Sequence, residues 1–387
     1  MRRRAAGFLW TGAVALLLGC TDAATTPWGN ADSGSGGSSS STSSGGGGSS
    51  SSGAGGGGSS AGSSSGGGSS SGNGGGQNGD AGTSPVDGGT ANGADGAEGG
   101  PGLAPRFACP PGPFPAPVAG SSQTVCANFA FKYNWFDGPT WIDSEQAFFF
   151  SNYTNGAAGP ADIVKYTPGG ACETWLAGAG CNGLSAAYDG TLIAVCQGSR
   201  AVLAFDIKTK QPKTLASMYM GQMLDSPNDV VAHSNGSIFF TNPTYELGGR
   251  PQGVGPAIFY IDPGGTLNLI AKTPGLQPNG IALSPDETHL YVEEDGAGTK
   301  VFDLDATGAP SGGPRDFAGG TDGLSVDCAG NLYLAGGSII SPAGMQVGSF
   351  PGGTMGVFGG ADGKTLFVVA NGSPHHTVQM TVPGPPH

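Results

Sequence analysis

The sequence predicts an all-β chain, a six-bladed β-propeller preceded by a disordered Gly/Ser-rich linker. Charged residues make up only 11% of the 387 residues while glycine fills 76 positions, a composition that argues against an all-α fold. From Phe107 onward, short β-prone runs are broken by Gly, Pro, Asn and Asp, with no long stretch of helical period. One pattern of apolar residues, a turn and a strongly β-prone run occurs six times in this part of the chain.

The six copies recur at a nearly constant interval. Their turns fall at Ser144, Asp189, Asn235, Asp286, Ala329 and Asp362. The spacings are therefore 45, 46, 51, 43 and 33 residues. A four-stranded propeller blade needs roughly 40–50 residues, whereas a β-sandwich has no such repeat. The short last interval predicts that a strand near the N-terminus, around residues 129–133, completes the last blade.

Residues 1–20 have the features of a bacterial lipoprotein signal. Three arginines at positions 2–4 precede an apolar core over 8–18 that is too short to span a bilayer. Leu-Leu-Gly before Cys20 resembles a lipobox, and acylation of Cys20 after cleavage would hold the chain on a membrane through lipid alone. The alternative is ordinary cleavage beside an incidental cysteine. Thr21 after the cysteine favours the outer membrane, on its periplasmic or cell-surface side.

Residues 21–105 form a Gly/Ser-rich linker that cannot bury enough apolar surface to offset its ordering entropy. We expect it to act as a flexible tether, with an end-to-end distance of roughly 50 Å, for a propeller over residues 106–387. With 15 basic and 28 acidic residues the net charge is −13, and loss of the three signal arginines gives 12 − 28 = −16. This acidity disfavours nucleic acid as a partner. We expect a monomer that contacts a membrane only through its N-terminal lipid.

Six cysteines remain besides Cys20, an even number typical of disulfides in an exported chain. They are Cys109, Cys126, Cys172, Cys181, Cys196 and Cys328. We expect bridges Cys109–Cys126 and Cys172–Cys181 to close short loops, which leaves Cys196 and Cys328 paired with each other or free. There is no Cys-x-x-Cys motif and no nearby histidine to favour a zinc or redox site.

Polar residues also recur in phase with the repeat. Seven residues before the six turns stand Asp137, Asn182, Asn228, Asn279, Asp322 and Met355. Turn chemistry would explain any one Asp or Asn, but not five in the same register. Equivalent positions of successive blades lie at one height around the channel, so these side chains are expected to converge. Their oxygen-only donors suit Ca²⁺, Mg²⁺ or Mn²⁺, and Zn²⁺ also accepts carboxylates.

Around these positions, over about residues 128–384, the chain resembles the senescence-marker-protein/gluconolactonase/luciferin-regenerating-enzyme family of six-bladed propellers. The matching stretches include Ser226-Pro227-Asn228-Asp229, Pro278-Asn279-Gly280-Ile281 and Asp322-Gly323-Leu324-Ser325. The resemblance implies a metal-dependent lactonase that acts on sugar or other small lactones. It also implies that Asp137, Asn279 and Asp322 bind the ion, with calcium as the first choice.

The resemblance further implies roles around the ion. Asn228 would contact metal-bound water or substrate, and Asn182 and Ser226 are further candidates for substrate contact. Asp322 would take a proton from the attacking water, while the ion polarises the lactone carbonyl. Residues 106–387 contain no Gly-x-Ser-x-Gly elbow, so a serine hydrolase is not expected.

Three positions depart from the family pattern. Asp137 stands where the family usually has Glu, one methylene longer, so a backbone shift or a bridging water is needed. Ser226 replaces an Arg of the animal members, which shifts substrate preference. Cys196-Gln197-Gly198 replaces a frequent Glu-His-Gly and loses a substrate contact. The tether and the shorter Asp137 keep a second hypothesis open, a non-catalytic surface propeller that binds glycans or proteins, and other propeller chemistry such as strictosidine-synthase-like condensation is a third.

Overall fold

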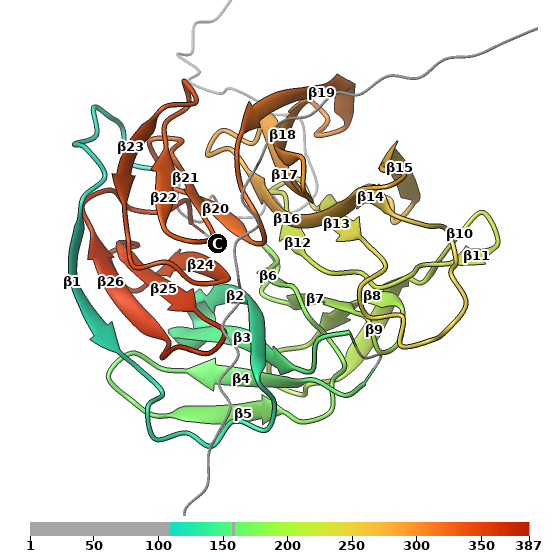
Figure 1. Ribbon diagram of the computed structural model, residues 1–387, viewed down its shortest axis with the longest axis horizontal. Helices are drawn as coiled ribbons and strands as arrows, with labels where there is room; N and C mark the ends of the chain where they lie inside the picture. Colours follow the sequence, from blue (N-terminus) through green and yellow to red (C-terminus); the bar gives the residue numbers. More distant parts are fainter. Residues whose placement is uncertain (1–108, 157–158, 387) are drawn as a thin grey trace, which may run out of the picture. The chain divides into compact units, whose positions relative to one another are not determined.

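Four-stranded antiparallel sheets surround a central axis in the computed structural model, which describes residues 109–156 and 159–386 (Figure 1). There are six such sheets, so the predicted six-bladed propeller is confirmed. Within the described residues the only helical segment is the 3₁₀ turn η1 (Asp143–Glu145). No described helix is long and apolar enough to cross a membrane. The predicted signal, the lipidation cysteine Cys20 and the whole predicted linker lie outside the described residues.

Five blades are built from consecutive strands, which follow one another from the channel outward. Blade 1 contains β2 (Trp135–Ile142), β3 (Ala147–Tyr153), β4 (Asp162–Tyr166) and β5 (Cys172–Leu176). Blade 2 contains β6 (Leu184–Ala186), β7 (Leu192–Cys196), β8 (Ala201–Phe205) and β9 (Pro212–Ala216). Blade 3 contains β12 (Val230–Ala232), β13 (Ile238–Asn242), β14 (Ala257–Ile261) and β15 (Leu267–Lys272). Blade 4 contains β16 (Gln277–Leu283), β17 (His289–Asp295), β18 (Gly298–Leu304) and β19 (Pro310–Ala318), and blade 5 contains β20 (Leu324–Val326), β21 (Leu332–Leu334), β22 (Ser338–Ile340) and β23 (Gln346–Ser349).

Each predicted turn joins the two innermost strands of a blade, as expected from the repeat. Asp189 shows why these residues turn the chain, since its carboxylate accepts hydrogen bonds from the backbone N–H and the hydroxyl of Thr191 at 2.9 and 2.7 Å. The second strand of a blade packs against neighbouring blades on both faces. Phe148, Phe149 and Phe150 of β3 are accordingly all completely buried, although they alternate between faces.

Blade 6 is closed by a strand from the N-terminal side of the domain, as predicted, but not by the predicted residues. It contains β24 (Met355–Gly359), β25 (Thr365–Val369), β26 (His376–Met380) and, at its outer edge, β1 (Ala119–Thr124). The prediction of a strand at residues 129–133 was wrong, because the aromatic side chains there pack against the hydrophobic core. The ring of Phe131 lies 4.7 Å from that of Phe136 and 5.0 Å from the imidazole of His375.

The predicted disulfide pairing was also wrong. The structure joins Cys109 to Cys328, Cys126 to Cys172 and Cys181 to Cys196. Spatial neighbours therefore decide the pairing, rather than short loops. In blade 2 the two cysteines lie on adjoining segments of the chain. The backbone N–H of Asn182, which follows Cys181, donates to the carbonyl oxygen of Val195, which precedes Cys196, at 2.8 Å. The longest bridge, between residues 219 positions apart, ties the start of the described chain to blade 5.

A ring of close backbone contacts holds the inner strands together around the channel. A Cβ atom on Gly183 would lie 2.5 Å from the Cα atom of Asp229 and 2.6 Å from Asn228 O in the next blade. Gly280 and Gly323 are placed in the same way against blades 5 and 6. Because these positions directly follow the in-phase polar residues, the tight ring fixes the height at which those side chains enter the channel.

We expect Gly183→Ala to destabilise the propeller by about 3 kcal/mol, because its methyl group cannot avoid the backbone of blade 3. Urea unfolding followed by tryptophan fluorescence would measure the free energy of unfolding. Gly313→Ala is the matched control, since a Cβ on Gly313 meets no atom within 4 Å and should leave the stability nearly unchanged. Equal stabilities of the two variants would contradict the close packing inferred for the ring.

Candidate functional site

The five predicted polar residues all lie at the same end of the inner strands. Asp137 is in β2 and Asn279 in β16. Asn182, Asn228 and Asp322 stand just before β6, β12 and β20. The predicted register is therefore present, and the ring of blades turns five separated sequence positions into one polar region.

Charge effects on Tyr153 show that acidic groups from different blades share this region. Burial is the largest cause that raises its pKa well above the ordinary value. The charges of Asp137, Glu246 and Asp322 raise it further. The side chain of Asn182 acts in the opposite direction and lowers the pKa. Carboxyl groups of blades 1 and 5 and of the segment after β13 thus act together on one phenol group of blade 1.

The two predicted metal-binding carboxylates lie in an environment that disfavours negative charge. Burial raises the pKa of Asp137 above its usual range, with the charge of Asp229 as the next cause. Burial also raises the pKa of Asp322, followed by the charge of Asp137. Hydrogen bonds from Gly138 N–H to Asp137 and from Asn279 to Asp322 offset only part of this effect. The region has more carboxylate than the protein itself neutralises.

The amide side chains add polar atoms that lack protein partners. Asn182 Oδ1 accepts a hydrogen bond from Ser151 Oγ at 3.3 Å, but Asn182 Nδ2 is buried without a partner. Asn228 is only 3% exposed, and its Oδ1 is also buried without a hydrogen-bond partner. Buried polar atoms without hydrogen bonds are uncommon and need an explanation. A bound ligand would supply one.

Asn279 connects Asp322 to a second acidic pair on blade 4. Its Nδ2 lies 3.5 Å from Asp295 Oδ1, and the hydroxyl of Tyr245 donates to the other oxygen of Asp295. The neighbouring Glu293 has both carboxyl oxygens buried without partners, and burial raises its pKa to about 9. Glu293 is therefore protonated at neutral pH, which limits the net charge beside Asp322.

Asp229 has a structural role that its place in the sequence motif did not reveal. Its Oδ1 accepts from Val230 N–H at 2.8 Å and its Oδ2 from Ile281 N–H at 2.9 Å. The carboxylate thereby bridges the inner strands of blades 3 and 4. Burial raises its pKa to about 7 despite these two bonds.

Ser226 is completely buried beneath the segment that follows β13. Its hydroxyl donates to Pro243 O at 3.1 Å and accepts from Glu246 N–H at 3.3 Å. The geometry gives Ser226 a supporting role for Glu246, and its contact with substrate stays a prediction.

Glu246 is the residue that sequence reasoning missed. It is 2% exposed, its Oε2 has no partner, and burial raises its pKa to about 7. Its charge also raises the pKa of Asp137. Glu246 lies outside the blade repeat, so the in-phase count could not find it. The signal available was its place at the start of the 245–255 loop, which lies between β13 and β14 of blade 3.

Arg250 fixes this loop against blade 2. Its guanidinium donates to Gln197 O at 2.7 Å, Gly198 O at 3.0 Å and Glu246 O at 3.0 Å. The side-chain amide of Gln197 is buried with no partner for either its oxygen or its nitrogen. The segment that departs from the family pattern therefore borders the Glu246 loop, with donor and acceptor atoms still available.

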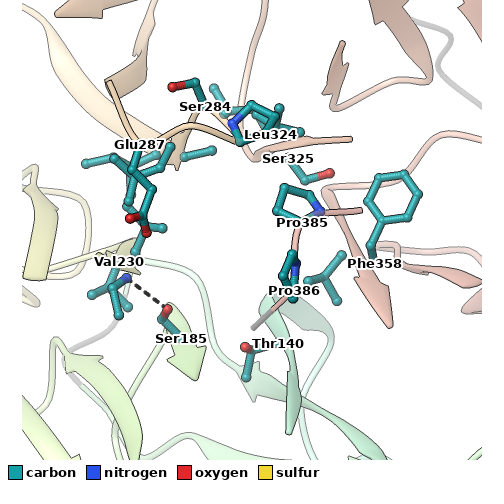
Figure 2. A pocket seen from close by; sticks show the side chains of 18 of the residues that line it. Thr140, Ser185, Val230, Ser284, Glu287, Leu324, Ser325, Phe358, Pro385 and Pro386 are labelled. Carbon is teal, nitrogen blue, oxygen red and sulfur yellow. Dashed lines mark hydrogen bonds between the residues drawn. The ribbon is translucent and has the colours of Figure 1, made fainter. Parts of the chain in front are cut away.

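A separate cavity of about 260 Å³ occupies the other end of the channel. It is lined by the later residues of the inner strands and by the C-terminal residues Pro385 and Pro386 (Figure 2). Ser325 and Glu287 are among the polar residues that line it. None of the five in-phase polar residues lines this cavity. We therefore place the candidate site at the acidic end.

The donors at the acidic end fit a divalent cation. Asp137 and Asp322 supply two carboxylates whose repulsion a cation would relieve, and Asn228 Oδ1 is an amide oxygen without a partner. Within residues 109–156 and 159–386 no three His, Cys, Asp or Glu side chains are grouped as a metal site. The candidate set contains only two acids, and its other donors are amide oxygens. Hard cations accept both kinds of oxygen as ligands.

Comparison with known proteins agrees with this geometry. Residues 135–372 match the family described as "SMP-30/Gluconolactonase/LRE-like region". The gluconolactonase of Zymomonas mobilis is 30% identical over 272 residues, which cover 61% of this chain and 73% of that protein. A solved structure assigned to the gluconolactonases is 26% identical with a TM-score of 0.61, covering 71% of this chain and 96% of that one. Calcium-binding regucalcin from Agrobacterium tumefaciens shares the fold, at 18% identity and a TM-score of 0.52 over 65% of this chain and 92% of that one.

The buried acids predict how the stability of the metal-free protein depends on pH. Their folded pKa values lie above those of the unfolded chain, so the folded state keeps protons that the unfolded state has released. We expect the free energy of unfolding to fall between pH 7 and 9, by about 1.4 kcal/mol per pH unit for each proton retained. His375 does not mask this trend, because burial lowers its pKa to about 4.

Urea unfolding in chelator at several pH values would measure this slope. Asp322→Asn removes one of the titrating groups and should flatten it. Asp316→Asn, whose carboxylate is 90% exposed, should keep the wild-type slope. Added divalent cation should restore stability at pH 9. A stability that is constant or rises over this range would refute the electrostatic description of the site.

Proposed function

Because this chain belongs to the SMP-30/gluconolactonase/LRE-like family, we propose that it is a metal-dependent hydrolase of sugar lactones or other small lactones. The observation that carries the proposal is the set of buried oxygen donors in phase at one end of the channel. It is supported by the Zymomonas mobilis relative, which is named a gluconolactonase. Membership of the family supports the reaction class, and the geometry of the site supports the choice of candidate residues.

We propose that Asp137, Asn279 and Asp322 hold the divalent ion, with Asn228 beside it. Calcium is the first choice, because the donors are oxygens and a protein of the same fold is named calcium-binding; Zn²⁺, Mg²⁺ and Mn²⁺ are the alternatives. When bound, the ion supplies positive charge that polarises a lactone carbonyl. Because Asp137 is one methylene shorter than the usual Glu, this role would need a backbone shift or a bridging water.

The hydrolysis itself needs a group that accepts a proton from water as the water oxygen attacks the carbonyl carbon. Asp322 is our candidate for this base, because its pKa is raised by burial and by the charge of Asp137. When the ring ester bond breaks, the proton passes to the released alkoxide oxygen. The products are the hydroxy acid and a regenerated carboxylate on Asp322.

The unpartnered polar atoms favour a polyhydroxylated substrate. Asn228 Oδ1 and Glu246 Oε2 accept hydrogen bonds, and Asn182 Nδ2 donates them. A sugar lactone presents hydroxyl groups that satisfy both kinds of atom, whereas an aliphatic lactone would leave them buried and unpaired. We therefore expect sugar lactones to be preferred.

We expect chelator-stripped protein to regain hydrolysis of glucono-δ-lactone when one of Ca²⁺, Zn²⁺, Mg²⁺ or Mn²⁺ is added. Asp322→Asn should lower kcat by about 10²- to 10⁴-fold, because the base is lost while the side-chain volume is kept. A pH indicator assay would follow acid release. Asp316→Asn serves as the control and should keep wild-type turnover, since its side chain is exposed on β19.

Wild-type turnover in Asp322→Asn would remove this residue from the mechanism. An ion-binding protein that hydrolyses neither glucono-δ-lactone nor aliphatic lactones would instead favour the second hypothesis, a propeller that binds glycans or proteins without catalysis. Thermal shifts with each ion would distinguish loss of binding from loss of turnover.

We also propose that the protein is exported and anchored in the outer membrane by lipid on Cys20. The three disulfides of the described domain support an oxidising compartment. In a Gram-negative host, the full chain is expected in the membrane fraction and Cys20→Ser in the soluble periplasmic fraction, because lipid is the only proposed anchor. Immunoblots of the two fractions would test this, and membrane retention of Cys20→Ser would contradict it.

A further inference from the structure

Three exposed methionines gather on one small hairpin at the rim of the propeller. Strands β10 (Met218–Tyr219) and β11 (Gln222–Met223) form this two-stranded sheet outside the blades (Figure 1). Met218, Met220 and Met223 are 52%, 87% and 43% exposed. The whole chain has 7 methionines, so three within six consecutive residues is a concentration that packing of the core does not require.

The hairpin register places two of the thioether side chains next to each other. Met218 pairs directly with Met223, and Tyr219 pairs with Gln222. The next pair away from the turn is Ser217 and Leu224, where Leu224 N–H donates to Ser217 O at 3.0 Å. Hydrogen-bonded and non-hydrogen-bonded pairs alternate in an antiparallel ladder, so the methionine pair is the non-hydrogen-bonded one. In such pairs the Cβ atoms are about 5 Å apart on the same face.

Met220 adds a third thioether at the tip of the hairpin. Its backbone has a conformation that residues other than methionine usually adopt. The two residues of the turn, Met220 and Gly221, have φ values of 47° and 81°. A turn with positive φ at both positions favours Asn, Asp or Gly. A long apolar side chain in the left-handed region, 87% exposed, gains no packing that would offset this preference.

The hairpin is held firmly from its opposite face. Tyr219 points toward blade 3, where its ring lies 5.2 Å from that of Phe259. The backbone is fixed as well, because Val254 N–H donates to Met223 O at 3.0 Å. Met218 and Met223 therefore project outward from a backbone that the protein already orders, while their unbranched side chains stay free to adjust.

We propose that this hairpin is a binding site for a soft monovalent cation, Cu(I), held by the sulfur atoms of Met218, Met220 and Met223. Thioether sulfur is a soft ligand that selects Cu(I), whereas Ca²⁺ and Mg²⁺ require oxygen donors. The net charge of −13 adds a general attraction for cations. The site is distinct from the carboxylate and amide donors of the channel, and it does not depend on the proposed lactonase activity.

Silver(I), which has the same preference for soft ligands and does not change oxidation state, is the probe for this site. Isothermal titration in chloride-free buffer would use the full chain with Cys20→Ser, because a thiol there would compete for silver. We expect one silver ion per chain. Replacement of all three hairpin methionines by leucine should weaken binding at least tenfold, since leucine keeps the apolar volume but removes the sulfur.

Met345→Leu is the matched control, because Met345 is 63% exposed but stands alone, and this variant should bind silver like the parent. In methyl-labelled protein, the ε-methyl signals of the three hairpin methionines should shift together on addition of one equivalent. Urea unfolding of the triple variant should match that of the parent, which would show that the fold is intact.

Equal silver binding by the triple-leucine variant would overturn the proposal, as would failure of the parent to bind. Sedimentation with phosphatidylethanolamine vesicles tests the other role that an exposed apolar hairpin suggests. If parent and triple variant both sediment with the vesicles while neither binds silver, the hairpin is an apolar docking element and not a cation site.

Discussion

The candidate site depends on how closely the inner strands approach one another around the channel. At Gly183 and Gly323 the neighbouring strand occupies the space that any Cβ atom would need. Backbone hydrogen bonds cross the same contacts, from Gly183 N–H to Asn228 O and from Gly323 N–H to Thr354 O. Because the strands cannot slide relative to each other without losing these contacts, the residue before each glycine is held at a fixed height. The polar character of those residues then becomes a property of one end of the channel.

That geometry concentrates carboxyl groups where the protein has little positive charge to balance their ionised forms. Asp137 and Asp322 repel each other, and Glu246 adds a third carboxyl from outside the repeat. The nearby Arg250 does not relieve this repulsion by an ion pair, since its hydrogen bonds go to backbone oxygens of the loop and of blade 2. Repulsion among these carboxylates destabilises the folded protein when no cation is bound. Binding of a cation would recover the free energy lost to this repulsion.

Much of this could be predicted from sequence, because local chemistry sets it. Turns such as Asp189-Gly190-Thr191 recur at blade length, and counting from them locates Asp137 and Asp322. Glu246 could not be found in this way, since it enters the site through a loop that has no counterpart in the repeat. The closing strand was misplaced because β1 has the weakly β-prone sequence Ala-Gly-Ser-Ser-Gln-Thr and gains its strand conformation from pairing with β26. The disulfides were mispaired because contacts between strands distant in sequence decide them.

The two ends of the channel differ in a way that bears on how a substrate enters. Cys109, Pro385 and Pro386, near both ends of the described chain, line the cavity opposite the acidic end. Cys328 holds them there, through its disulfide to Cys109 and by donating its N–H to Pro383 O at 2.8 Å. The cavity end is therefore occupied by anchored chain, whereas the acidic end is bordered by the 245–255 loop. The acidic end can therefore be reached without displacing Cys109, Pro385 or Pro386, along a border formed by the loop that carries Glu246.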